Sequence, residues 1–143
     1  MTQRSRVIEA PAQAIFDLLA DPRGHAVIDG SGPVRDVQEG TPDRLGPGVR
    51  FGMQMRWALP YKILNEVVEF DEPRVIAWRH FGGHVWRWIL DPVDDQHTNV
   101  TEQFDARPSK GPVVLRLMGS QRRSGGWIDA SLDRLADWAA QRS

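Results

Sequence analysis

The strongest constraint on the fold is a two-residue alternation that begins about a third of the way along the chain. At residues 49–57, arginine, glycine and glutamine alternate with large apolar side chains. This period is typical of a β-strand that has one face on the core. The apolar face of the expected strand consists of Val49, Phe51, Met53, Met55 and Trp57.

Further strands of the same kind follow, and short turns separate them. The expected strands cover residues 61–70, 75–80, 84–90 and 97–105, with shorter extended stretches at 4–10 and 34–39. Proline, glycine and aspartate are common in the intervening turns. Because the gaps are short, the pattern favours antiparallel pairing of consecutive strands.

The Gly82-Gly83 turn decides how its two flanking strands pair. A two-residue loop would put Trp78 on the same face as Arg87, which mixes polar with apolar positions. A three-residue loop over residues 81–83, with Gly83 in the left-handed conformation, avoids that mixing. We therefore expect the three-residue loop. It places on one face Ile76, Trp78, His80, His84, Trp86, Trp88 and Leu90.

Helical periodicity flanks the strands at both ends of the chain. After Pro11, apolar side chains at residues 12, 15, 16 and 19 share one face, which predicts a helix of about ten residues. Asp21-Pro22 is a start signal for a short helical turn over residues 23–28. A turn is also expected at residues 113–118, ahead of a long terminal helix. The apolar stripe of that helix is Trp127, Ile128, Leu132, Leu135 and Ala139.

Gly125 and Gly126 interrupt the helix propensity of this last segment. Each glycine costs up to ~1 kcal/mol relative to alanine inside a helix. The pair predicts either a kink or a place where side chains are unwanted, and the sharper hypothesis is that it leaves room for a ligand.

The composition fits one ordinary folded domain over residues 1–143. Of the 143 residues, 41% are hydrophobic and 26% are charged. Cysteine is absent from the sequence, which excludes disulfides, thiolate metal sites and cysteine nucleophiles.

The charge pattern and the apolar runs bear on partners and location. The formal net charge is −1 with both signs mixed along the chain, so no nucleic-acid partner is expected. No apolar run approaches the ~20 residues that cross a bilayer, and the N-terminus lacks the apolar region of a secretory signal. We expect a cytoplasmic monomer or homodimer without a membrane span.

These elements predict an α+β fold in which helices cover one face of a curved antiparallel sheet. The terminal helix is the only long cover, and a helix about 10 Å across is too narrow for six or seven strands spaced ~4.8 Å apart. The sheet must therefore curl around the helix, and a cavity is expected at its wide end.

Several short motifs, in this order, resemble a known superfamily. Residues 7–12 and 15–22 are similar to the opening of START-like, birch-pollen-allergen-like proteins, often called SRPBCC. The polyketide cyclase/dehydrase-like branch of that superfamily has motifs similar to four further segments, residues 29–32, 69–73, 76–79 and 98–102.

The resemblance spans residues 6 to about 138, and it implies a helix-grip fold. In that fold a seven-stranded antiparallel sheet wraps around a long C-terminal helix, two short helices follow the first strand, and a hydrophobic cavity lies between sheet and helix. The resemblance further implies binding of lipids, polyketides or sterols, with cyclisation or dehydration catalysed by a minority of members. Fold alone does not decide between these activities.

The aromatic residues of the inward face are the first candidate site. Any one of them is explained by core packing, but four tryptophans on one face, with flexible methionines beside them, suit an apolar ligand pocket. The expected lining is Met53, Met55, Trp57, Trp78, Trp86, Trp88, Phe104 and Leu132.

His80, His84 and Glu102 are the polar candidates on the same face. Partial solvation at a loop end is the usual explanation for histidines without a known partner. A metal site shared with Glu102 has no supporting ligand spacing, so no metal and no cofactor are expected. The remaining readings are orientation of a ligand, or a proton-transfer pair of one imidazole with Glu102 as tentative catalytic residues. His25 and Asp29, four residues apart near the second helical turn, are a less strongly supported candidate for binding a polar group of the ligand.

Three functions therefore stay open. The first is a carrier or sensor that binds a hydrophobic small molecule such as a polyketide or lipid. The second is a cofactor-independent polyketide aromatase/cyclase or dehydratase with His80 and Glu102 as acid and base. The third is a protein-interaction module with a closed core.

Overall fold

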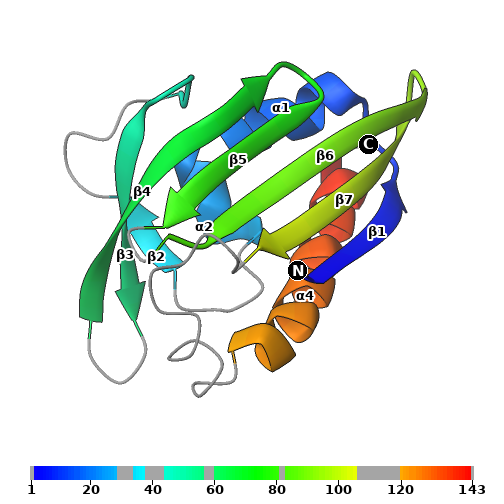
Figure 1. The fold of residues 1–143 in the computed structure, drawn as a ribbon. Helices are drawn as coiled ribbons and strands as arrows, with labels where there is room; N and C mark the ends of the chain where they lie inside the picture. The colour runs from blue at the N-terminus through cyan, green and yellow to red at the C-terminus, as the bar shows by residue number, and fades with distance from the viewer. Residues whose placement is uncertain are drawn as a thin grey trace.

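A computed structural model describes residues 2–28, 34–37, 44–56, 60–80, 83–105 and 120–142 (Figure 1). Side chains at 26, 34–37, 51–64, 80 and 120–124 lie outside this description. The elements in chain order are β1 (Thr2–Ile8), α1 (Ala12–Ala20), the 3-10 turn η1 (Pro22–Gly24), α2 (His25–Ile28), β2 (Val34–Val37), β3 (Arg50–Arg56), β4 (Pro60–Asp71), β5 (Val75–His80), β6 (Val85–Asp94), β7 (His97–Asp105) and α4 (Ser120–Arg142).

The strands form one antiparallel sheet in the order β1-β7-β6-β5-β4-β3-β2. Strands β2 to β7 are neighbours in chain order, and β1 pairs with β7 at the far edge. The helices lie on one face of this sheet, where α4 contacts β1, β7 and α2 (Figure 1). The predicted α+β class, with an antiparallel sheet and a long C-terminal helix, is confirmed.

The predicted register of the β5–β6 hairpin is confirmed. Trp78 pairs with Trp86, and Ile76 pairs with Trp88. Gly83 has φ 103°, the left-handed conformation that a glycine adopts without strain. Residues 81 and 82 lie outside the described part of the chain.

Several predicted boundaries move. Strand β6 runs on to Asp94, where the prediction ended it at residue 90. The additional residues are exposed, so the apolar pattern gave no sign of a hairpin that extends past the core. At its tip the Asp94 carboxylate accepts a hydrogen bond of 2.8 Å from the backbone N–H of Gln96. The turn expected at residues 113–118 falls outside the described residues.

Helix α1 buries the predicted face. Ala12, Ile15, Phe16 and Leu19 are all buried, with Pro11 in the N-cap position. The start signal at residues 21–22 is also confirmed, because the Asp21 carboxylate accepts a hydrogen bond of 3.0 Å from the N–H of Arg23.

Helix α4 is continuous through both glycines, so neither of them ends the helix. A Cβ atom built on Gly125 would lie 3.1 Å from the Arg4 guanidinium, whereas one on Gly126 meets nothing within 4 Å. The Arg4 side chain therefore occupies the space beside Gly125, where the hypothesis placed a ligand, whereas the space beside Gly126 is open.

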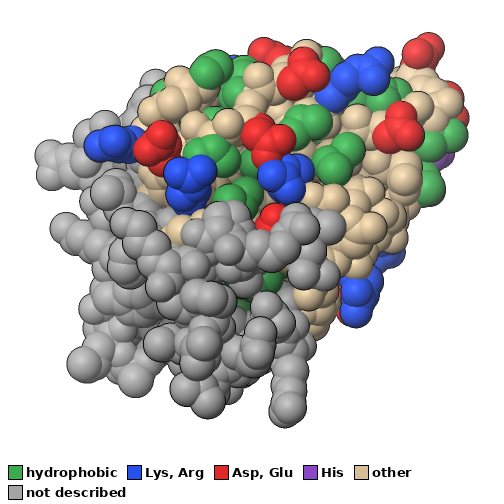
Figure 2. Space-filling view, in the orientation of Figure 1, with side chains coloured by type: hydrophobic (Ala, Val, Ile, Leu, Met, Phe, Trp, Pro, Cys, Tyr) green, Lys and Arg blue, Asp and Glu red, His purple; other side chains and the backbone are tan. Residues whose placement is uncertain are grey.

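The opposite face of the sheet is polar and charged. Arg87 is paired with Glu69, and its guanidinium also donates to the Gln103 side chain at 2.9 Å. Figure 2 shows both signs of charge interspersed with apolar side chains over the described part of this face. Strands β4 to β7 thus have one solvent face and one core face.

Candidate functional site

Burial of the inward side chains decreases along β5 and β6 toward their hairpin. The cross-strand pair Ile76 and Trp88 is buried, with exposed fractions of 0% and 2%. The next pair toward the hairpin, Trp78 and Trp86, is only partly buried, and so is His84 beyond it. The sheet is therefore tightly covered at one end of these strands and less covered at the other.

Strand β7 continues this inward layer. Phe104 is the cross-strand partner of Trp86, and the two ring centroids lie 4.8 Å apart. The ring of His84 lies 5.3 Å from that of Phe104. Glu102, two residues back along β7, is the partner of Trp88 and is 4% exposed.

Two helical residues complete the layer from the other side. The His25 imidazole stacks on Trp78 with ring centroids 4.5 Å apart and an interplanar angle of 25°. Its Nε2 lies 2.9 Å from the Leu19 carbonyl oxygen. Trp127 of α4 lies 6.5 Å from Trp86. We call this group the aromatic cluster: His25, Trp78, His84, Trp86, Phe104 and Trp127.

Four members of this cluster, Trp78, His84, Trp86 and Trp127, are partly exposed, whereas His25 and Phe104 are buried. Aromatic rings that face a protein interior are normally covered, because each buries a large apolar area. Trp78 and Trp86 pack against the core with one side and keep part of their surface accessible. Accessible aromatic surface on the covered face of a sheet is the kind of lining that a small apolar molecule contacts.

Burial lowers the pKa of His84 to about 4. The charged imidazolium is disfavoured because the ring has lost its water and lies against the apolar Phe104 ring. His84 is therefore neutral near pH 7, where it acts as a hydrogen-bonding group and not as a cation.

The Trp88 indole is a buried polar group in this region. Its Nε1 has no hydrogen-bond acceptor among the described residues. An unpaired buried donor typically costs about 1–3 kcal/mol. The adjacent Glu102 places a buried carboxyl group on the same inward face.

The structure brings together part of the predicted lining. Trp78, Trp86, Trp88, His84, Glu102 and Phe104 share one face, as the register above requires. Leu132 is 3% exposed and belongs to the core beneath α4. The other predicted site residues lie outside the described part of the chain: Trp57 altogether, and the side chains of Met53, Met55 and His80.

Sequence reasoning missed two members of the cluster. Trp127 was assigned to the apolar stripe of the terminal helix, and only the approach of α4 to β6 reveals its contact with Trp86. His25 was weighed with Asp29, which lies outside the described residues. Its stacking on Trp78 joins residues distant in sequence, and a four-residue helix carries no periodic signal for it.

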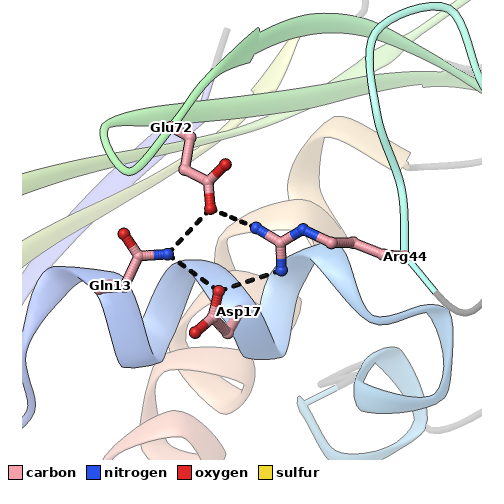
Figure 3. A network of polar contacts seen from close by, with 4 residues as sticks. All are labelled: Gln13, Asp17, Arg44 and Glu72. Carbon is pink, nitrogen blue, oxygen red and sulfur yellow. Dashed lines mark hydrogen bonds and ion pairs between the residues drawn. The ribbon is translucent and has the colours of Figure 1, made fainter.

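A separate polar network lies at the other end of β5. Figure 3 shows Gln13 and Arg44 each bridging Asp17 of α1 and Glu72 in the β4–β5 turn. Arg44 also lies over the Phe16 ring, 5.8 Å from its centroid. These exposed contacts tie three segments together on the closed end of the molecule, away from the aromatic cluster.

The described residues contain neither a metal-ion site nor a membrane-spanning helix. No group of three histidine, aspartate or glutamate residues in that part of the chain is placed to hold a metal ion. None of the described helices is long and apolar enough to span a membrane.

Solved structures with this arrangement are known. The Zhui aromatase/cyclase from Streptomyces sp. R1128 is similar with a TM-score of 0.69 and 22% identity, over 99% of this chain and 93% of that one. A START superfamily protein from Mycobacterium smegmatis has a TM-score of 0.70 and 13% identity, over 99% and 98% of the two chains. At such identities the likeness shows a shared fold.

The sequence comparisons reach further than the fold. The uncharacterized protein Rv0088 from Mycobacterium tuberculosis is 34% identical over 143 aligned positions, covering 96% of this chain and 63% of that protein. This chain thus spans less than two thirds of the length of that relative. The family model for polyketide cyclase/dehydrase and lipid transport matches residues 2–139. The chain therefore belongs to the polyketide cyclase/dehydrase and lipid transport family, a START-like family.

Proposed function

We propose that this chain binds a hydrophobic small molecule, such as a polyketide or a lipid, between the sheet and α4. The observation that carries the proposal is the partial exposure of Trp78 and Trp86 on the face that α2 and α4 cover. An apolar molecule lying against these rings would remove that surface from water, at about 25 cal/mol per Å².

The family supports the same proposal. Its description combines polyketide cyclisation or dehydration with lipid transport, and each of these activities needs an apolar ligand. The protein would act as a carrier or a sensor of this molecule. The sheet would wrap around α4 in a helix-grip arrangement, with the molecule between them.

Truncation of the aromatic cluster tests this proposal. Trp86→Ala and Trp78→Ala each remove a large contact surface, so we expect Nile red to bind at least tenfold more weakly than to the wild type. The measurement is a fluorescence titration, with circular dichroism to verify the fold. Trp138→Ala is the matched control, because Trp138 lies near the end of α4 beside Arg142. Equal affinity of all four proteins would contradict the proposal.

A second candidate function is polyketide aromatase/cyclase or dehydratase activity. The observation that favours it is the burial of the Glu102 carboxyl group on the inward face beside Trp88. A buried carboxylate next to a bound carbonyl compound would serve as a base for the carbon beside that carbonyl. His80 would be the acid–base partner, whereas His84, neutral at pH 7, would orient the ligand.

Exchange of carbon-bound hydrogen tests the catalytic candidate. In D₂O the wild type is expected to speed deuterium incorporation into the methyl group of 2-acetylnaphthalene, followed by NMR. Glu102→Gln keeps the shape of the side chain and removes the base, so the rate should fall at least about a hundredfold. His80→Ala should also lower it. Unchanged exchange in both variants would exclude these roles.

A further inference from the structure

Trp88 lies at the boundary between the two ends of the inward face. On the closed side Leu90 is 2% exposed, and on the other side Trp86 is partly exposed. Trp86 lies two residues along β6, or roughly 7 Å, from Trp88. A molecule that lies against Trp86 and extends inward would therefore end at Trp88.

The indole of Trp88 carries a buried hydrogen-bond donor. The side chain is 2% exposed, and its Nε1–H meets no acceptor among the described residues, the adjacent Glu102 included. Buried tryptophan N–H groups usually find a partner, because the unpaired state costs the full desolvation of the donor. An acceptor supplied by a bound molecule would offset this cost.

The neighbouring carboxyl group restricts what that acceptor is. Glu102 is 4% exposed and is the cross-strand partner of Trp88, so both side chains project from the same face. Two acidic groups in one buried site cannot both ionise without a large penalty. A neutral oxygen, such as a ketone carbonyl, meets the indole N–H without that penalty.

We propose that Trp88 is a specificity-determining residue whose Nε1–H donates a hydrogen bond to a neutral carbonyl oxygen at the inner end of the ligand. This inference rests on the proposed binding function, and it narrows the ligand class to aromatic or polycyclic ketones over hydrocarbons of the same shape. A site built to donate a hydrogen bond discriminates strongly against an analogue without the acceptor.

A pair of isosteric probes tests the inference. 2-Acetylnaphthalene and 2-isopropenylnaphthalene differ by an oxygen in place of a CH₂ group. The wild type should bind the ketone about tenfold more tightly than the alkene, because only the ketone pairs with the buried donor. Trp88→Phe should bring this ratio close to one. Trp86→Phe, which leaves Trp88 intact, should keep it.

The indole signal gives a second readout that does not depend on a variant. In ¹H–¹⁵N spectra with assigned tryptophan side chains, the ketone should move the Trp88 Nε1–H resonance downfield, and the alkene should leave it near its free position. A shift of this kind decides the question even if Trp88→Phe does not fold.

The outcomes separate this inference from the binding function. The role of Trp88 would be overturned if the wild type bound the ketone and the alkene with equal affinity, or if the affinity ratio were the same in wild type and Trp88→Phe. In either case, binding of the alkene would still support an apolar site. That result would assign the indole N–H to a retained water molecule. If neither probe binds at its solubility limit, the proposed function and this inference both fail.

Discussion

At the residue scale, the environment of each inward side chain decides its chemistry. Histidine commonly titrates near neutral pH, yet burial beside Phe104 lowers the pKa of His84 to about 4. Trp88 and Trp86 are the same residue type two positions apart, but only Trp88 is almost fully buried. The residue pattern predicted that these side chains share a face, whereas their burial depends on how the helices cover the sheet.

The titration of His84 predicts a pH dependence of stability. The folded-state pKa of about 4 lies below the unfolded value of 6.5, so the unfolded chain binds more protons between these values. Above pH 6.5 this residue has no effect on the slope. As pH falls from 6.5 to 4, it should lower the free energy of unfolding by up to about 3 kcal/mol.

Urea unfolding at a series of pH values measures this effect. Other groups titrate in the same range, so the comparison is between the wild type and His84→Gln, with His97→Gln in the exposed β6–β7 hairpin as the control. The His84 variant should lose less stability between pH 6.5 and 4 than either other protein. Parallel curves for all three would show that His84 is not desolvated as described.

At the element scale, local signals were sufficient for most of the fold. Alternation placed the central strands, and the conformational freedom of Gly83 set the three-residue hairpin that aligns Trp78 with Trp86. At Gly125 and Gly126 the low helix propensity left open whether the helix is kinked or continues. Packing of α4 against β1 overrides that local cost, and the propensity scale contains no term for this tertiary contact.

The two glycines of α4 give a matched pair of substitutions. Gly126→Ala adds a methyl group in open space, so it should raise the free energy of unfolding by up to about 1 kcal/mol. Gly125→Ala should gain less, because its Cβ would lie 3.1 Å from the Arg4 guanidinium and force that side chain to move.

A double-mutant cycle identifies the cause. Arg4 forms an exposed ion pair of 3.7 Å with Asp129 and donates an exposed hydrogen bond of 2.8 Å to the Gln3 carbonyl oxygen, so Arg4→Ala alone should cost less than about 1 kcal/mol. In the Arg4→Ala background, the gain from Gly125→Ala should approach that from Gly126→Ala. Thermal or urea denaturation measures all four differences. Equal gains in both backgrounds would remove Arg4 from the explanation.

At the scale of the whole molecule, the two ends of the sheet differ in how completely their inward side chains are buried. At one end, α1 and α4 bury Ile15, Phe16 and Leu135 completely, and the Arg44 network ties α1 to the β4–β5 turn (Figure 3). At the other, α2 and α4 contribute His25 and Trp127 to a layer that stays partly exposed. The first end is closed by its contacts, and the second is where the proposed ligand would bind.

The sequence predicted this plan more readily than its details. A single long helix is too narrow for the sheet, so the sequence predicts a curled sheet with a cavity at its wide end. The sequence pattern did not indicate that His25 stacks on Trp78, or that the Trp88 Nε1 meets no acceptor among the described residues, because both depend on contacts between segments distant in the chain.

The most direct test of the binding site is the location of a bound apolar molecule by intermolecular nuclear Overhauser effects. With 2-acetylnaphthalene and ¹³C-labelled protein, we expect contacts to the aromatic protons of Trp78, Trp86 and Phe104. Contacts confined to exposed side chains such as Val7 and Val93, which are 54% and 62% exposed, would contradict a site between the sheet and α4.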